Sequence, residues 1–170
     1  MKYVNSLYYI LLHYVISGIY PTKFGCKLKN FCLKWSGIDK GKNLLIHLGV
    51  FISGHKNIKI GDDCVLSKDC ILMGKGGILL GDRVLVGYSS KILTGAHVIP
   101  KGLGSIRFSG HTYKPIRIGK DVWIGSNCVI MPGVNIGDNS IIAAGAIVNR
   151  DVPANVIFGG VPGKILKQRI

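Results

Sequence analysis

The fold is decided by residues 115–152, which read PIRIGKDVWIGSNCVIMPGVNIGDNSIIAAGAIVNRDV. An aliphatic residue recurs there at a strict spacing of six, at Ile118, Ile124, Ile130, Ile136, Ile142 and Val148. A second inward-type position follows each of them four residues later, at Val122, Cys128, Val134, Ser140, Ala146 and Val152. This period fits neither a helix nor a simple alternating strand. It is typical of a hexapeptide β-helix, in which each hexad supplies one short strand and a turn.

A less regular block of the same hexads precedes this stretch. It starts at Ile60, slips by two residues across Gly74–Gly77, and resumes at Leu80. Glycine adopts turn geometries that other residues cannot, so we expect a turn at the slip. The repeat then breaks at residues 97–115, which are rich in glycine and proline and predict a loop projecting from the coil. Such insertions commonly build the functional face of repeat proteins.

We therefore expect an all-β repeat fold with short flanking segments. A helical N-terminal segment spans residues 1–40, the hexapeptide β-helix spans 41–152 and carries the loop 97–115, and a C-terminal tail spans 153–170. The tail ends in a basic segment, with Lys164, Lys167 and Arg169, and we expect this end to be helical. Because an open β-helix end exposes unpaired backbone groups, both termini are candidate caps.

The N-terminal segment contains a nearly apolar run, Tyr3 to Tyr20. The run is short and interrupted, whereas a spanning helix needs about 20 apolar residues. It also lacks the small-residue cleavage site of a signal peptide. Two interpretations remain open. The run is either a helix packed on the coil or on a neighbouring subunit, or a peripheral membrane helix formed by residues 1–20 and helped by nearby lysines, namely Lys23, Lys27, Lys29 and Lys34.

The composition limits the possible partners and the compartment. The chain has 170 residues, 22 Lys or Arg against 8 Asp or Glu, and a formal net charge of +14. This excess favours an anionic partner, but the basic residues are scattered, which argues against nucleic acid. The five cysteines form no CxxC pair and are expected to be small core residues. A reducing cytoplasm is therefore the expected compartment. If residues 1–20 form a peripheral membrane helix, the protein is expected at the inner face of the membrane.

The stretch from Pro115 to Gly125 resembles the signature of hexapeptide-repeat O-acetyltransferases. The likeness continues through Pro132–Asn139, Ala143–Ala146 and Asp151–Pro153 to Gly159–Lys164. It is similar to the maltose and galactoside acetyltransferases and to enzymes that acetylate surface polysaccharides. The resemblance implies a left-handed parallel β-helix, a homotrimer with active sites between neighbouring subunits, and acetyl-CoA as the donor substrate. It implies no metal.

The resemblance also implies a catalytic base. His97, in Thr94-Gly95-Ala96-His97, stands where that family carries its base. An imidazole changes charge near neutral pH, which suits removal of a proton from an attacking sugar hydroxyl. Backbone amides at glycine-rich corners, such as that of Gly125, are candidates to stabilise the oxyanion. His111 is the second candidate base, and it is otherwise expected to bind the acceptor together with Tyr113 and Asp69.

The donor contacts are carried over from the same family. Ser126 and Ala144 match residues along the pantetheine arm, and Trp123 is expected near the donor groove. Asn149 and Arg150 match a pair near the nucleotide. Lys164 and Lys167 match two arginines that meet the phosphates, where lysine acts as a point charge without a bidentate fork.

Other functions remain open at this stage. A carbonic anhydrase on the same fold needs three histidines converging on zinc, and the histidine spacing here does not favour it. A non-catalytic β-helix scaffold and an acetyltransferase of a small acceptor, such as an antibiotic or a free sugar, are the alternatives. The residues favour an O-acetyltransferase that acts on a sugar or lipid-linked saccharide in lipopolysaccharide, capsule or other surface glycan synthesis.

Overall fold

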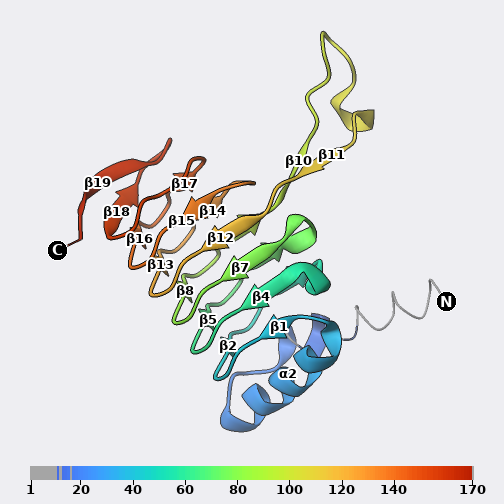
Figure 1. Ribbon diagram of the computed structural model, residues 1–170. Coiled ribbons are helices and arrows are strands. Elements are labelled where there is room, and N and C mark those ends of the chain that lie inside the picture. The colour runs from blue at the N-terminus through green and yellow to red at the C-terminus, as the bar shows by residue number, and fades with distance from the viewer. Residues whose placement is uncertain (1–10, 12, 16, 170) are drawn as a thin grey trace.

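The computed structural model describes residues 11, 13–15 and 17–169 (Figure 1). The chain winds into a coil of short strands stacked along one axis. Helix α2 (Lys23–Ser36) lies at one end, and the hairpin of β18 (Val156–Gly159) and β19 (Lys164–Gln168) lies at the other. The parallel β-helix expected from the hexads is therefore confirmed.

The strands form three faces, which we call A, B and C. Face A contains β1 (Asp39–Lys40), β4 (Ile58–Ile60), β7 (Ile78–Leu80), β12 (Ile116–Ile118) and β15 (Asn135–Ile136). Face B contains β2 (Leu45–Ile46), β5 (Val65–Leu66), β8 (Leu85–Val86), β13 (Trp123–Ile124), β16 (Ile141–Ile142), β18 and β19. Face C contains β3 (Phe51–Ser53), β6 (Ile71–Met73), β9 (Lys91–Leu93), β14 (Val129–Ile130) and β17 (Ile147–Val148). All neighbouring pairs within these faces are parallel except β18–β19.

The core is a column of residues inside the coil. All the positions that the hexads identified between Ile118 and Val152 are buried. Ser140, the polar member, donates a hydrogen bond to the carbonyl of Pro153 at 2.7 Å. Three cysteines also lie in the column, and burial raises the pKa of Cys70 to about 11 and raises the pKa of Cys64 and Cys128. These thiols stay neutral and pack as small apolar groups, as the sequence predicts.

The register between coils shows where extra residues are accommodated. Lys40 pairs with Ile60, and Ile60 with Leu80, whereas Ile118 pairs with Ile136. The longer early coils each contain a 3-10 turn at the corner between faces C and A, namely η1 (His55–Asn57) and η2 (Gly74–Gly76). The predicted slip at Gly74–Gly77 is η2. The β-helix predicted from residue 41 includes β2 and β3, but hexads were identified only from Ile60, and neither β1 nor the turn η1 was predicted.

The corner between faces A and B uses aspartate side chains to join successive coils. Asp82 Oδ1 accepts a hydrogen bond from the backbone N–H of Asp62 at 2.9 Å, and Asp62 Oδ1 accepts one from Lys42 at 2.7 Å. One residue of each turn is left-handed, a conformation for which Asn and Asp are suited. Arg83 binds Asp121 through two hydrogen bonds and holds the pKa of that carboxyl below its usual value.

Helix α2 covers the N-terminal end of the coil. Thr22 caps the helix by accepting a hydrogen bond from Gly25 N–H, and Gly37 ends it in a left-handed conformation. Lys29, a residue of this helix, is buried against the coil, where its Nζ donates to the carbonyl of Ile46 at 2.8 Å. Burial lowers the pKa of this lysine. The prediction that Lys29 helps a membrane contact is therefore wrong.

The C-terminal end of the coil is closed by a strand. The tail was expected to end as a helix, but β19 runs antiparallel to β18 instead. The physical reason is that β18 would otherwise leave an unpaired edge, and the tail satisfies its backbone groups. In the part of the chain that the structure describes, no helix has the length and hydropathy needed to cross a bilayer.

Two adjacent leucines of β7 test whether the inner column dominates stability. Leu80 is 1% exposed inside the coil, and Leu79 is 44% exposed on face A. We expect Leu80→Ala to lower the free energy of unfolding by about 2–5 kcal/mol, because it leaves a cavity. Leu79→Ala should lower it by less than about 1 kcal/mol. Urea unfolding followed by circular dichroism measures both, and equal losses would contradict the assignment.

Candidate active site

The interruption of the repeat forms a hairpin at the corner between faces C and A. Strand β10 (Gly95–His97) continues from face C and pairs antiparallel with β11 (His111–Tyr113). Between them, residues 98–110 project away from the coil and contain the 3-10 turn η3 (Ile106–Phe108) (Figure 1). The chain then returns to face A at β12. The loop predicted at 97–115 therefore lies at one corner and starts from a short β-ladder.

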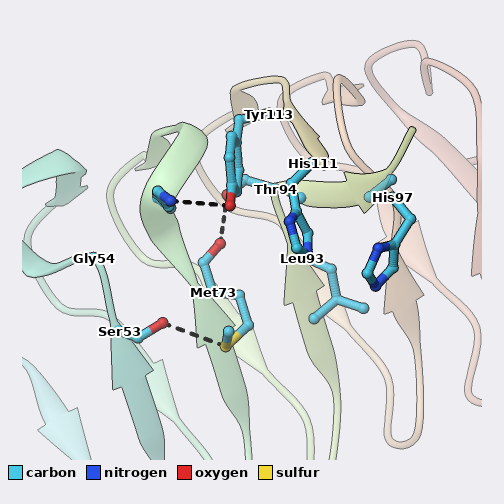
Figure 2. A pocket seen from close by; sticks show the side chains of 11 residues that line it. Ser53, Gly54, Met73, Leu93, Thr94, His97, His111 and Tyr113 are labelled. Carbon is cyan, nitrogen blue, oxygen red and sulfur yellow. Dashed lines mark hydrogen bonds between the residues drawn. The ribbon is translucent and has the colours of Figure 1, made fainter. Parts of the chain in front are cut away.

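A cavity of about 480 Å³ lies at the root of this hairpin. Its volume is within the range of small-molecule sites, about 300–1,000 Å³. Successive coils contribute its lining, and Met73 and Leu93 supply apolar surface beside the polar side chains (Figure 2). The residues that line it are Ser53, Gly54, Met73, Lys75, Leu93, Thr94, Gly95, Ala96, His97, His111 and Tyr113.

Two histidines stand together at this cavity. His97 and His111 are directly opposite each other in the β10–β11 ladder, and their ring centroids lie 4.3 Å apart (Figure 2). The ring of Tyr113 stacks on the other side of His111, with the centroids 6.2 Å apart. His97 and His111 are exposed, so a substrate in the cavity can reach either imidazole. The structure thus brings together three of the residues that the sequence proposed for the site.

A buried threonine fixes the floor beside these rings. Thr94 Oγ1 accepts a hydrogen bond from Gly76 N–H at 2.9 Å and donates one to the carbonyl of Met73. These two bonds hold both ends of the η2 turn, which carries Lys75. Asn57 Nδ2 donates to the carbonyl of Lys75 at 2.8 Å from the preceding coil. The turn is therefore tied to the coils on both sides.

The proposed donor residues lie elsewhere on the same chain. Ser126 and Ala144 occupy successive turns at the corner between faces B and C, where Gly145 N–H donates to the carbonyl of Ser126. Trp123 lies on the outer surface of face B and is half exposed. Because His97 follows β9 at the opposite edge of face C, one chain does not bring the proposed base and these pantetheine contacts together.

The proposed phosphate contacts are divided between two regions. Lys164 and Lys167 are exposed on β19, at the C-terminal end of face B. Asn149 and Arg150 follow β17 at the corner between faces C and A and are also exposed. These two groups of residues lie on different edges of the coil.

Two further expectations concern Asp69 and Gly125. Asp69 lies in a turn between faces B and C, next to Lys68 with a 3.7 Å ion pair, and does not line the cavity with His97. The amide of Gly125 donates to the carbonyl of Ile142 at 2.8 Å. Its hydrogen is committed to the strand ladder, so this amide is a poor oxyanion donor. Among the residues described, no group of three or more His, Cys, Asp or Glu side chains is placed to hold a metal ion.

Sequence reasoning missed Lys75, Thr94 and Met73 as site residues. Lys75 Nζ donates to Tyr113 Oη at 3.0 Å, across 38 residues of sequence. The sequence signal that could have identified Lys75 was the glycine-rich register shift at Gly74–Gly77. A turn that departs from the hexad register places its residues outside the regular coil. Only the pairing of β10 with β11 brings Tyr113 back to that turn.

Known proteins share both the repeat and the fold. A family model described as the hexapeptide repeat of succinyl-transferase matches residues 57–87 and 115–150. Galactoside O-acetyltransferase of Escherichia coli is 37% identical over 129 residues, which cover 75% of this chain and 62% of that protein. WcaF of Escherichia coli, assigned as an acetyltransferase of colanic acid biosynthesis, is 29% identical over 140 residues, covering 82% of this chain and 74% of that protein.

A solved structure extends the similarity to most of the chain. It is a galactoside acetyltransferase in complex with coenzyme A, with a TM-score of 0.72 and 30% identity, covering 94% of this chain and 78% of that one. The sequence alignment with the Escherichia coli galactoside enzyme nevertheless spans less than two thirds of that enzyme's length. The repeat, the coil and these alignments agree, and the chain belongs to the hexapeptide-repeat acetyltransferase family.

Proposed function

We propose that this protein transfers an acetyl group from acetyl-CoA to a sugar hydroxyl, with His97 as the general base. The observation that carries the proposal is the position of His97 at the rim of a cavity of substrate size, at the root of the long loop that interrupts the repeat. A similar solved protein holds coenzyme A, and the curated relatives are named as acetyltransferases of galactosides and of colanic acid biosynthesis.

In the proposed reaction, His97 accepts one proton from the acceptor and later donates it to the leaving group. His97 takes the proton of the acceptor hydroxyl as its oxygen attacks the thioester carbonyl. The tetrahedral intermediate collapses with cleavage of the carbon–sulfur bond, and the proton on His97 passes to the departing sulfur to give coenzyme A. His111, whose ring lies 4.3 Å from that of His97, is proposed to orient the sugar.

We propose that the working unit is a homotrimer. In one chain the proposed base and the proposed pantetheine contacts lie at different corners, and a neighbouring copy would supply the missing half. Face B offers a surface for that neighbour, because an apolar residue occupies its outer position in every coil, namely Leu45, Val65, Leu85, Trp123, Ile141 and Ile157. A continuous apolar strip of this kind is typical of an interface.

We also propose that the enzyme acts at the cytoplasmic face of the inner membrane on a lipid-linked saccharide of a surface glycan. Most of residues 1–20, where sequence places the membrane contact, lies outside the described residues. Helix α2 gives separate support. Phe24, Phe31 and Trp35 share one side of the helix and are 76%, 62% and 67% exposed. Lys23, Lys27 and Lys34 lie exposed beside them, an arrangement suited to an anionic lipid surface.

Replacement of His97 tests the chemistry. We expect His97→Ala to lower kcat/KM for acetyl transfer by about 100-fold or more, because the attacking hydroxyl loses its base. Coenzyme A binding, measured by calorimetry, should be unchanged. His111→Ala is the matched control at the same cavity and should have a smaller effect on kcat. Thiol release across a panel of sugars measures both, and a His97→Ala variant with wild-type activity would falsify the role.

Mixing two inactive variants tests whether each site is shared between copies. His97→Ala and Ser126→Trp should each be inactive alone. When the two are co-expressed with different tags and the mixed trimer is isolated, each trimer holds one intact site, so about a third of the sites are restored. Recovered thiol release near that fraction supports the shared site. No recovery in a proven mixed trimer contradicts it.

Vesicle binding tests the membrane contact. The wild type should sediment with vesicles containing phosphatidylglycerol but not with pure phosphatidylcholine, and should be released by high salt. A Phe31→Ser, Trp35→Ser double variant should bind about tenfold more weakly, because the buried apolar area is lost. Phe108→Ser, an exposed phenylalanine of the projecting loop, is the control. The idea fails if the double variant binds like the wild type.

A further inference from the structure

The cavity beside His97 has an unbalanced charge. Its lining includes Lys75, His97 and His111 but no carboxylate. The chain has eight acidic residues, all aspartates, and every one of them lies outside this lining. Most of them are used at other corners of the coil, as Asp62 and Asp82 are. The site can therefore offer positive charge to a ligand without internal compensation.

The backbone that carries the lysine of this cavity, Lys75, is held in place by neighbouring residues. The η2 turn that carries Lys75 is held by Thr94 from one side and by Asn57 from the other. Gly54 packs so closely that a Cβ there would lie 2.6 Å from the amide nitrogen of Lys75. A cation held by a fixed backbone loses less freedom on binding than one on a mobile loop.

The ammonium group of Lys75 is also positioned. Its Nζ donates to Tyr113 Oη at 3.0 Å and lies 4.5 Å from the centroid of the ring. Tyr113 in turn packs against Gly95, where a Cβ would lie 2.9 Å from the ring carbon Cε1. Among the described residues, the ion pairs do not include Lys75. The bond to Tyr113 occupies one of the three ammonium donors and aims the group along the cavity wall.

From these contacts we infer that the acceptor is an acidic sugar, and that Lys75 binds its carboxylate or phosphate group while His97 meets the hydroxyl. The inference rests on the proposed function and names the class of acceptor at the same site. A charged acceptor gains a charge-assisted hydrogen bond that a neutral sugar of equal size lacks. Tyr113 serves as a positioning residue for the lysine. The apolar surface of Met73 and Leu93 would lie against the sugar ring.

Matched pairs of acceptors test this selection. Methyl glucoside is compared with methyl glucuronide, and glucose with glucose 6-phosphate, in the acetyl transfer assay. We expect the wild type to prefer the acidic member of at least one pair by about tenfold or more in kcat/KM. Whichever pair shows the preference identifies a carboxylate or a phosphate as the recognised group.

Variants of two lysines separate the site from general charge. Lys75→Gln should remove most of the preference, by lowering kcat/KM for the acidic member about tenfold more than for the neutral member. Lys56→Gln is the control, since Lys56 is exposed on the corresponding turn η1 but does not line the cavity. An equal loss with both members of a pair, a raised KM for acetyl-CoA, or the same change in Lys56→Gln overturns the inference.

Direct binding keeps this test apart from that of the proposed function. Each sugar is titrated into the protein without acetyl-CoA and followed by NMR. Tighter binding of the acidic member to the wild type, lost in Lys75→Gln, supports the acidic subsite even if no sugar is acetylated. Absent transfer then counts against the acetyltransferase alone. Binding without any acidic preference overturns the inference whether or not transfer occurs.

Discussion

Every part of this structure depends on the backbone ladder between successive coils. Each coil must return its strands to the same register as the coil below, as Lys40, Ile60 and Leu80 do on face A. A residue that does not fit the hexad can be accommodated only at a corner, where no ladder is broken. The turns η1 and η2 and the loop 98–110 all leave the coil between faces C and A. The cavity lies at this corner because these turns and the loop build its walls.

The regular parts of the fold could be predicted from the sequence because the same residue types recur at the same positions of each hexad. Between Ile118 and Val152 each inward position carries a small or aliphatic residue, so the period is plain, and the column is buried as predicted. The sequence places the start of the β-helix at residue 41, but the hexads of the first coil are not evident, because Lys40 occupies a position where later coils carry isoleucine or leucine. The tail was misjudged because its alternation is too short to separate a strand from a helix, and pairing with β18 decides the outcome.

The site could be predicted only in part, because some of its contacts depend on how the loop returns to the coil. His97, His111 and Tyr113 could be selected because they border the break in the repeat and resemble a family pattern. Lys75 could not, because it reaches Tyr113 only after the chain has left the coil at β10 and returned at β11. The failure of Gly125 as an oxyanion donor is similar. A glycine after an aliphatic looks like an exposed corner in sequence, but the ladder to Ile142 uses its amide.

The same ladder explains where the few acidic side chains lie in a chain with a net charge of +14, and therefore why positive charge is left at the cavity. An aspartate in a turn accepts the backbone N–H of the preceding coil, as Asp82 does for Asp62 and Asp138 does for Lys120. The stacked turns between faces A and B thereby hold most of the acidic residues of a chain that has few. Beside the cavity, the corner between faces C and A uses 3-10 turns and a threonine in place of such carboxylates. The aspartate of this corner, Asp151, lies in a later coil, where it accepts the N–H of Asn135, and does not line the cavity. Structural use of aspartate at one corner thus leaves the cavity at another corner cationic, which a sugar binding there would experience directly.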